Sequence, residues 1–398
     1  MSTLGRRWIR LSTALRVTAM LFLVCGAAVA EDVQKMVLEP QDANLDMGQH
    51  LGQSGGGFVP IPQVISEPAV GYGLGVIGVY FHGDSQQPAA EEESLPQNIS
   101  LLAAGLTENG SWAAGVGHLG FWRDDTVRYR GFAGYGDLNL SFYSLVGVTL
   151  PAPIQLNIKG PAVFQEIKYR WHGPWFIGAQ YHFRRTESRL RVEANLPDEL
   201  LSSTLEDWLE RHLQSSQTTA GVGVVLDYDT LDSFFNPQSG SAYNLQYQWY
   251  RDHFGSDADY QLYKFKALNY WKIQTRLTLG LRLQYDGVQA EELSQLPNYV
   301  LPSIQLRGVS STRYQGEVVG VTEMELGYQW SQNWRLSVFL GAGRAGTDFS
   351  ALSKAPSVVN KGVGVRYQLV EQYDFYVGLD LARGPEETAL YIQAGSTW

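Results

Sequence analysis

The chain has 398 residues, a net charge of -10 at neutral pH, 44% hydrophobic residues and a single cysteine. An acidic chain of this kind argues against nucleic acid as a partner. Its 22 tyrosines, 11 tryptophans and 42 glycines are typical of a membrane barrel with aromatic girdles and closely packed strands.

The first thirty residues predict export from the cytoplasm. Four arginines between residues 6 and 16 precede a short apolar run at 17–24, and Ala28-Val29-Ala30 forms a small-x-small cleavage site. The run is too short to span a bilayer, which needs about 20 apolar residues. We therefore expect a signal peptide over residues 1–30, cleaved after Ala30. A lipoprotein signal ending at Cys25 is disfavoured because Val24 is larger than the residue that usually precedes a lipidated cysteine.

Cleavage would remove Cys25 and four arginines, which makes the mature chain still more acidic. It would also exclude a disulfide framework and a zinc-thiolate site. Residues 31–64 are predicted to be a periplasmic segment that ends in a glycine-rich linker at 52–57. The barrel domain is predicted over residues 65–398.

Alternating side chains predict transmembrane strands after the linker. Between residues 275 and 286 leucines and a tyrosine occupy one face, and Arg276, Arg282 and Asp286 occupy the other. Two arginines would be costly in a soluble core without partners, whereas the lumen of a barrel is polar. The pattern therefore predicts an all-β fold, a single transmembrane antiparallel β-barrel of about 16 strands. The expected location is the outer membrane of a Gram-negative bacterium, in contact with lipid and lipopolysaccharide.

The turns define the strand count. Strands are predicted near 66–81, 97–107, 111–122, 126–136, 138–148, 153–171, 174–187, 217–228, 239–252, 257–271, 274–287, 314–330, 333–344, 357–369, 371–382 and 387–398. The count depends on a hairpin at Gly136-Asp137, because bacterial barrels have an even number of strands and long loops on the outer side. With this hairpin, the long segments 82–96, 188–216, 288–313 and 345–356 all fall on one side.

Two connections have unusual sequences. Residues 84–96 contain three successive glutamates and predict a solvated acidic loop. Residues 198–213 have leucines and a tryptophan at helical spacing after a proline, which predicts an amphipathic helix. That helix either caps the barrel mouth, or lies on the membrane surface or engages a partner.

The sequence offers no credible enzyme site. The glycines at 73–78 match a GxGxxG string, but they lie within an alternating strand and not before a helix, as a dinucleotide site requires. Ser54 matches GxSxG by letters, yet no strand precedes it to build a nucleophile elbow. The seven histidines are scattered. We expect no catalytic residue, no metal site and no cofactor.

Three motifs are more informative. Arg307-Gly308 lies in the long segment 288–313 and precedes a strand with Glu323 and Glu325 on its lumen face. The turn at 227–240 contains Asp229, Asp232, Pro237 and Gly240. The segment Gly57-Phe58-Val59-Pro60-Ile61-Pro62 leads into the first predicted strand. In their order and spacing these motifs resemble the BamA/TamA-like superfamily of outer-membrane barrels, also called bacterial surface antigens.

The resemblance covers essentially the whole mature chain and implies that the loop with Arg307 folds back into the lumen. The family's loop arginine is received by a Phe-x-Asp-x-Gly strand, which here reads Phe339-Leu340-Gly341, so glycine replaces the aspartate. Leu231 likewise stands where the family's turn has arginine. Because an arginine in a confined lumen needs acceptors, we expect Arg307 to pair with Glu323 or Glu325. The alternative is an ordinary exposed loop arginine.

The resemblance also suggests a function. Relatives that insert or export proteins depend on periplasmic POTRA domains, and residues 31–60 are too few to form one. We expect a POTRA-less barrel that assists insertion or translocation of protein clients through a seam between its first and last strands. Glycines at both edges would weaken that seam, and the predicted seam residues are Gly71, Gly73, Gly75, Gly395 and Trp398. The alternatives are a passive channel or structural barrel and, least favoured, an enzyme.

Overall fold

The computed structural model describes residues 56–66, 69–82, 98–145, 148–190, 216–293, 296–371, 374–395 and 398. All of them belong to one compact unit, residues 46–398. The predicted signal peptide, the acidic segment 84–96 and the amphipathic helix at 198–213 lie outside the described residues. Within the described residues, no helix has the length and apolar character needed to cross a membrane.

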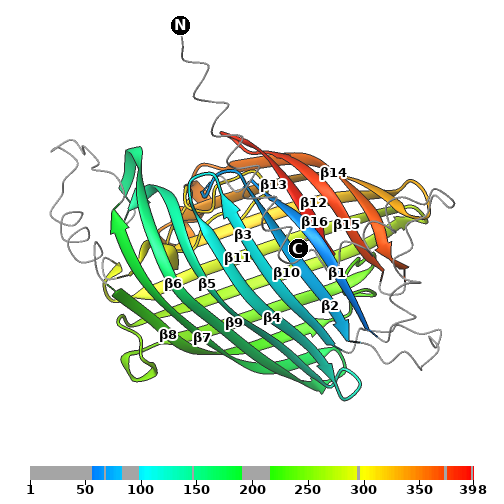
Figure 1. Ribbon diagram of the computed structural model, residues 1–398, viewed down its shortest axis with the longest axis horizontal. Coiled ribbons are helices and arrows are strands. Elements are labelled where there is room, and N and C mark those ends of the chain that lie inside the picture. The colour runs from blue at the N-terminus through cyan, green and yellow to red at the C-terminus, as the bar shows by residue number, and fades with distance from the viewer. Residues whose placement is uncertain are drawn as a thin grey trace, which may run out of the picture. The chain divides into compact units, whose positions relative to one another are not determined.

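Sixteen strands form one barrel-shaped sheet, in which each strand pairs antiparallel with the next along the chain (Figure 1). The two edge strands, β1 and β16, are not joined by a hydrogen-bonded ladder, so the barrel has an unsealed seam. The strands are β1 (Gly56–Ile65), β2 (Gly73–His82), β3 (Asn98–Thr107), β4 (Trp112–Trp122), β5 (Val127–Leu145), β6 (Val148–His172), β7 (Trp175–Leu190), β8 (Ser216–Asp229), β9 (Gly240–Tyr250), β10 (Tyr260–Gln274), β11 (Leu277–Ala290), β12 (Val318–Gln329), β13 (Trp334–Gly346), β14 (Val358–Val370), β15 (Phe375–Arg383) and β16 (Thr388–Ala394).

Short helices lie in the connections. They are η2 (Asp252–Phe254), η4 (Asn298–Val300) and α5 (Phe349–Lys354). The carboxylate of Asp348 caps α5 by accepting a hydrogen bond of 2.8 Å from the backbone N–H of Ala351, which satisfies one of the free donors of the first turn.

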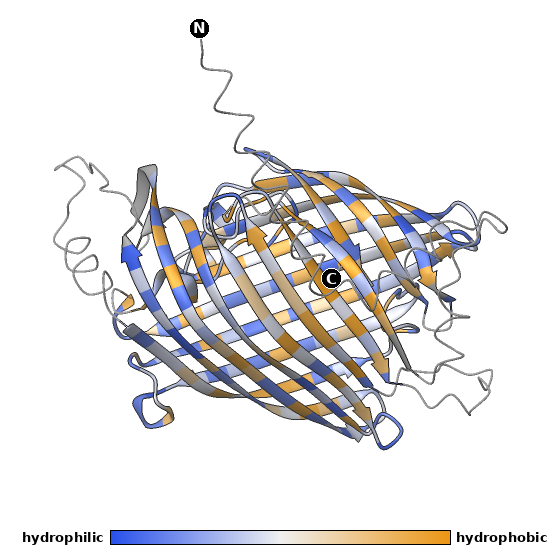
Figure 2. Ribbon diagram, in the orientation of Figure 1, coloured by the Kyte–Doolittle hydropathy of each residue, from blue (hydrophilic) through white to orange (hydrophobic). Residues whose placement is uncertain are grey.

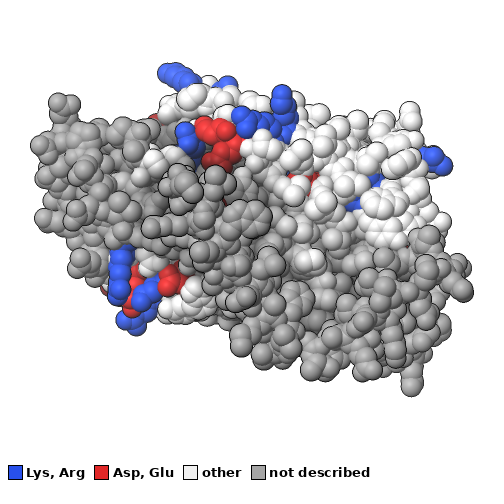
Figure 3. Space-filling view, turned by 45° about the horizontal axis from the view of Figure 1, so that its top comes forward, with Lys and Arg blue, Asp and Glu red and all other residues white. Residues whose placement is uncertain are grey.

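The alternation along each strand has the predicted sense. In β11, Leu283 is 40% exposed on the outer face, whereas Arg282 and Asp286 are buried in the lumen. Figure 2 shows this alternation as bands of opposite hydropathy along the strands. In the face shown in Figure 3, the charged side chains of the described residues gather in a few groups. The outer face of the strands exposes many large apolar side chains, among them Leu102 and Leu340. An exposed apolar surface of this kind is stable in contact with lipid and not with water.

The predicted hairpin at Gly136-Asp137 is wrong. β5 runs through both residues, and Gly136 pairs with Gly160 while Asp137 pairs with Lys159. A two-residue hairpin turn of the favoured type needs a positive φ, and neither residue has one. Glycine and aspartate are common in turns, but here they continue a strand that extends beyond the end of β4.

The sequence prediction also missed the first strand. β1 covers Gly56–Ile65 and pairs with β2 along its whole length, so the sheet begins earlier than residue 65. Pro60 and Pro62 concealed it, because proline is disfavoured inside a sheet. An edge strand tolerates proline where its missing N–H would face away from the neighbour. We infer that these two prolines remove donors from the open side of β1.

The count of sixteen is therefore correct, but two errors compensate in it. The expectation that all long segments fall on one side of the barrel is therefore wrong. The β2–β3 connection lies at the same end of the barrel as the short turns after β4 and β6. Without the false hairpin, the long segments connect strands at both ends of the barrel.

The long β11–β12 connection folds into the barrel. Tyr299 bonds to Thr186 of β7 at 2.8 Å, and further along the connection Ile304 packs against Val319 and Val321 of β12. Thr312 then donates to the backbone carbonyl of Ser141, near the tip of the β5–β6 hairpin, at 2.6 Å. The connection thus crosses the lumen from β7 to β12 and contacts the β5–β6 hairpin.

Candidate functional site in the lumen and at the seam

Arg307 and Gly308 lie where the β11–β12 connection approaches β15. Gly308 has a φ of +78°, a conformation that other residues adopt only with strain. A Cβ atom at this position would lie 2.9 Å from the backbone nitrogen of Gly384. The N–H of Gly308 donates to the hydroxyl of Tyr391 in β16 at 2.9 Å. Glycine therefore lets the connection approach closely enough to direct Arg307 into the lumen.

The guanidinium of Arg307 contacts three carboxylates. It lies 3.1 Å from Glu323, 2.9 Å from Glu325 and 2.7 Å from Asp380 of β15. The ring of Phe339 in β13 lies below it, with 3.3 Å between Cζ and the ring centroid. The side chain of Arg307 is only 9% exposed. The structure thus brings the three predicted lumen partners, Glu323, Glu325 and Phe339, together around Arg307.

Two further arginines complete this ion-pair network. Arg282 of β11 lies 3.3 Å from Glu323, and Arg366 of β14 donates to Asp380. Three cations therefore face three carboxylates. Removing one member of such a buried network leaves a charge without a partner, which costs about 3–5 kcal/mol. The network joins the loop to the wall formed by β11–β15.

Asn360 binds the loop backbone directly. This side chain is 0% exposed, and its amide donates to the backbone carbonyl of Arg307 at 2.9 Å and to Glu323 at 3.2 Å. Gly341, which replaces the family's aspartate, makes room here, because a Cβ atom would lie 2.5 Å from the Asn360 side chain. Asp380, on another strand, supplies a carboxylate to Arg307 instead.

Sequence reasoning missed Asp380, Arg366 and Asn360 as members of this site. Alternation along β15 places Asp380 on the lumen face, so its orientation was predictable. Which lumen carboxylate an arginine reaches depends on how far the loop penetrates, and nothing in the local pattern encodes that depth.

The C-terminal residue also enters the lumen. β16 ends at Ala394, and Gly395 follows with a φ of +75°. The indole N–H of Trp398 donates to Glu323 at 2.8 Å, and its ring lies beside that of Tyr270. Trp398, predicted as a seam residue, therefore lies in the lumen, because β16 ends before it and the left-handed backbone at Gly395 turns the chain away from the strand.

The seam is closed by a different kind of contact. Directly after β1, the hydroxyl of Ser66 donates to the backbone carbonyl of Leu390 in β16. Elsewhere, apolar side chains of β15 and β16 pack against the inner face of β1–β3. That cluster contains Val59, Ile61, Val79, Phe81, Ile99 and Phe375, with Val377, Ile392 and Ala394 against it.

This packing means that one edge of the sheet overlaps the other. Ile392 pairs with Leu379, which is 44% exposed on the outer face, so the two share a face. Yet Ile392 packs against the inner face of β1–β3. The C-terminal end of β16 therefore lies on the lumen side of β1.

The predicted seam glycines lie elsewhere. Gly73 and Gly75 belong to β2, where they pair with β1 and β3, and Gly71 lies in the β1–β2 turn with a φ of +82°. None of these three lies on an edge strand. Gly395 alone lies next to the seam, directly after β16.

The turn between β8 and β9 folds against the barrel end. Asp229 pairs with Arg128 at 2.5 Å, and Asp232 accepts hydrogen bonds from the N–H of Gln238 and the hydroxyl of Ser239, both at 2.9 Å. Gly240 ends the turn with a φ of +99°. Pro237 is buried within it, and Leu231, in place of the family's arginine, makes none of these side-chain bonds.

This turn reaches the seam and the β14–β15 connection. The ring of Phe235 packs against those of Phe81 and Phe375 with centroids 6.2 and 5.0 Å apart. Asn236 donates to Asp374 at 3.0 Å and accepts from Arg335 of β13. Burial raises the pKa of Asp374, and the hydrogen bond from Asn236 opposes that rise. The turn therefore braces the apolar cluster at the seam.

Comparisons with known proteins bear on the fold. No family model and no curated protein matches the sequence. Among solved structures, BamA from Haemophilus ducreyi lacking POTRA domains 1–3 has a TM-score of 0.54 at 13% identity, over 86% of this chain and 70% of that chain. CdiB from Escherichia coli has a TM-score of 0.55 at 9% identity, over 85% and 62%.

CdiB from Acinetobacter baumannii has a TM-score of 0.50 at 9% identity. The match covers about three fifths of the length of both CdiB chains, 60% and 62%. At these identities the likeness concerns the fold. The described residues form a sixteen-stranded barrel with an unsealed seam, similar in fold to the outer-membrane barrels of BamA and CdiB.

Proposed function

We propose that this protein is an outer-membrane barrel that assists the insertion or translocation of protein clients by opening between β1 and β16. The observation that carries the proposal is the seam itself. Each of the fourteen strands β2–β15 pairs with two neighbours. By contrast, β1 and β16 meet through packed apolar side chains and the hydrogen bond from Ser66 to Leu390. A barrel that serves only as a wall gains nothing from such an edge, because unpaired edges are a liability.

Opening this seam requires little free energy. The hydrogen bond from Ser66 contributes about 1 kcal/mol. The apolar side chains of β15 and β16 lose little if lipid or the apolar face of a client replaces the inner face of β1–β3. The separated edge of β16 has no proline and exposes backbone donors and acceptors, to which a client strand could add.

The lumen supports this route over a central pore. The β11–β12 connection is bound to β7, β14 and β15 and to the β5–β6 hairpin. A passive channel would require this connection to move, which would break buried ion pairs. The seam can open without breaking any of them.

A cross-linking experiment tests the proposal. Cysteines that replace Ser66 and Leu390, joined by a short bismaleimide, should lock the seam. In a strain that lacks the chromosomal gene, the locked protein should fail to restore the outer-membrane protein composition. The control pair replaces Met324 and Leu340, which lie opposite each other on the outer face of β12 and β13, and should restore it after the same treatment.

The proposal is wrong if the locked barrel restores the composition as well as the control, or if deleting the gene leaves that composition unchanged. Ion conductance through the purified barrel that the seam cross-link does not alter would favour a passive channel.

A further inference from the structure

One part of the lumen wall has almost no side chains. Five neighbouring strands carry glycine or alanine at lumen-facing positions: Gly75, Ala103, Gly105, Ala113, Gly115, Gly134, Gly136, Gly160 and Ala162. Their orientation follows from the residues beside them, since Leu74, Leu102 and Val116 are 57%, 58% and 54% exposed on the outer face. Glycine weakens a strand and often marks a site where a ligand approaches closely.

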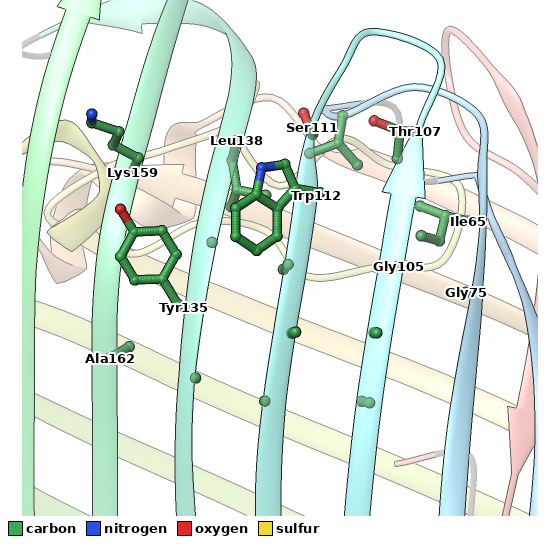
Figure 4. A pocket seen from close by; sticks show the side chains of 18 of the residues that line it. Ile65, Gly75, Gly105, Thr107, Ser111, Trp112, Tyr135, Leu138, Lys159 and Ala162 are labelled. Atoms are coloured by element: carbon green, nitrogen blue, oxygen red, sulfur yellow. The ribbon is translucent and has the colours of Figure 1, made fainter. Parts of the chain in front are cut away.

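The small side chains leave a cavity of about 570 Å³ against this wall. Figure 4 shows Gly75, Gly105 and Ala162 along it, with Ile65 of β1 at one side. The lining is almost entirely apolar and includes Leu138, Leu140 and Ile158. Its volume lies within the usual range of small-molecule sites, about 300–1,000 Å³. Because it reaches Ile65, the cavity extends to the strand that borders the seam.

A polar cavity of about 320 Å³ adjoins the apolar one, and both are lined by Phe132, Ala162, Arg184 and Tyr299. The polar cavity also contains Lys264 and Asp286. The guanidinium of Arg184 lies over the ring of Tyr299 at 4.9 Å. In the part of the chain that the structure describes, neither Arg184 nor Lys264 forms an ion pair with a carboxylate.

We propose that the two cavities together bind one molecule of a monoacyl phospholipid. The acyl chain would lie along the glycine and alanine wall, and the phosphate would contact Arg184 and Lys264. Two cations and one carboxylate leave a positive balance that suits a single phosphodiester. The bound molecule would enter from the membrane through the seam, beside Ile65. Lipid binding is independent of whether the protein acts on clients.

Native mass spectrometry with 1-palmitoyl-lysophosphatidylglycerol tests the proposal on the folded, detergent-solubilised protein. The wild type should retain one lipid molecule. Ala103→Leu fills the wall from the lumen side and should reduce the retained fraction at least tenfold. Its matched control is Ala133→Leu in β5, which lies opposite the outward-facing Val116 and should retain the lipid as the wild type does.

The phosphate contact is tested separately. Arg184→Gln should also reduce retention at least tenfold, whereas Arg185→Gln, which alters an exposed arginine bonded to Ser216, should not. Heat-modifiable mobility on gels establishes that each variant is folded. Equal retention by Ala103→Leu and Ala133→Leu would overturn the acyl-chain site. Equal retention of uncharged 1-palmitoylglycerol, or no effect of Arg184→Gln, would overturn the phosphate site.

Discussion

The wall formed by β11–β15 and the inner face of β1–β3 are held by opposite means. The first joins Arg307, Glu323 and Asp380 in an ion-pair network, in which each charge depends on particular partners. The second packs Val59 and Phe81 against the edge strand β16, and any other apolar surface could replace that contact. The barrel thus combines a wall that resists rearrangement with an edge that can exchange its neighbour at low cost.

The largest expected effect comes from the ion-pair network. Asp380→Asn leaves Arg307 and Arg366 with one carboxylate fewer, and removing one partner of a buried pair costs about 3–5 kcal/mol. Urea unfolding of the barrel in detergent measures this loss. The matched control is Glu386→Gln, because the pair of Glu386 with Arg313 is about one-third exposed and should contribute less than about 1 kcal/mol. Equal losses in the two variants would contradict the account.

A smaller effect is expected where the two regions meet. Trp398→Phe keeps an aromatic ring but removes the indole N–H that donates to Glu323, and a hydrogen bond to a charged group contributes about 1.5–3 kcal/mol. The same unfolding experiment measures the change. Trp330→Phe is the control, because Trp330 is 63% exposed on the outer face and should change little. If the two variants unfold alike, Trp398 does not couple the end of the chain to the network.

The edge can be altered in the opposite direction. Pro60→Val with Pro62→Val restores two N–H donors on the open side of β1, and each bond that forms with β16 contributes about 1 kcal/mol. Amide hydrogen exchange at residues 388–394 should then slow about tenfold, since a tenfold change corresponds to about 1.4 kcal/mol. Exchange in β12 should stay as it was. Unchanged exchange in β16 would show that something other than the prolines keeps the seam unpaired.

The smallest effect concerns Asp374 in the β14–β15 connection. Burial raises its pKa in the folded state, so the folded protein binds the proton more tightly than the unfolded chain. Its contribution to stability is therefore present at acid pH and is lost as the pH rises through the folded pKa. Asp374→Asn should flatten this dependence by less than about 1 kcal/mol, as measured by unfolding at a series of pH values. An unchanged pH dependence would contradict the assignment.

The sequence predicted the fold more fully than the lumen site. Alternation identified the strands with charged inner faces. In β11, for example, Arg282 must face the polar lumen because its charge would be costly on the lipid-facing side. It failed at β5, where Gly136 and Asp137 continue a strand, and at β1, where two prolines are tolerated only because the strand is an edge. Neither fact is local, since both depend on which strand lies alongside.

The lumen site, like the fold, could be predicted from the sequence only in part. Glu323 and Glu325 could be placed on the lumen face from their spacing, and the motif around Arg307 indicated the loop that reaches them. The roles of Asp380, Asn360 and Trp398 arise from the depth of the loop and from the turn at Gly395, which bring together residues from distant parts of the chain.

Spin labels in lipid bilayers test most directly whether the seam opens while the strands that carry the ion-pair network keep their positions. One pair replaces Val76 of β2 and Leu379 of β15, across the seam, and the other replaces Leu283 of β11 and Leu340 of β13, all on the outer face. The account predicts two populations of distances for the first pair and one narrow population for the second. A single narrow population for both pairs would show that the seam does not open.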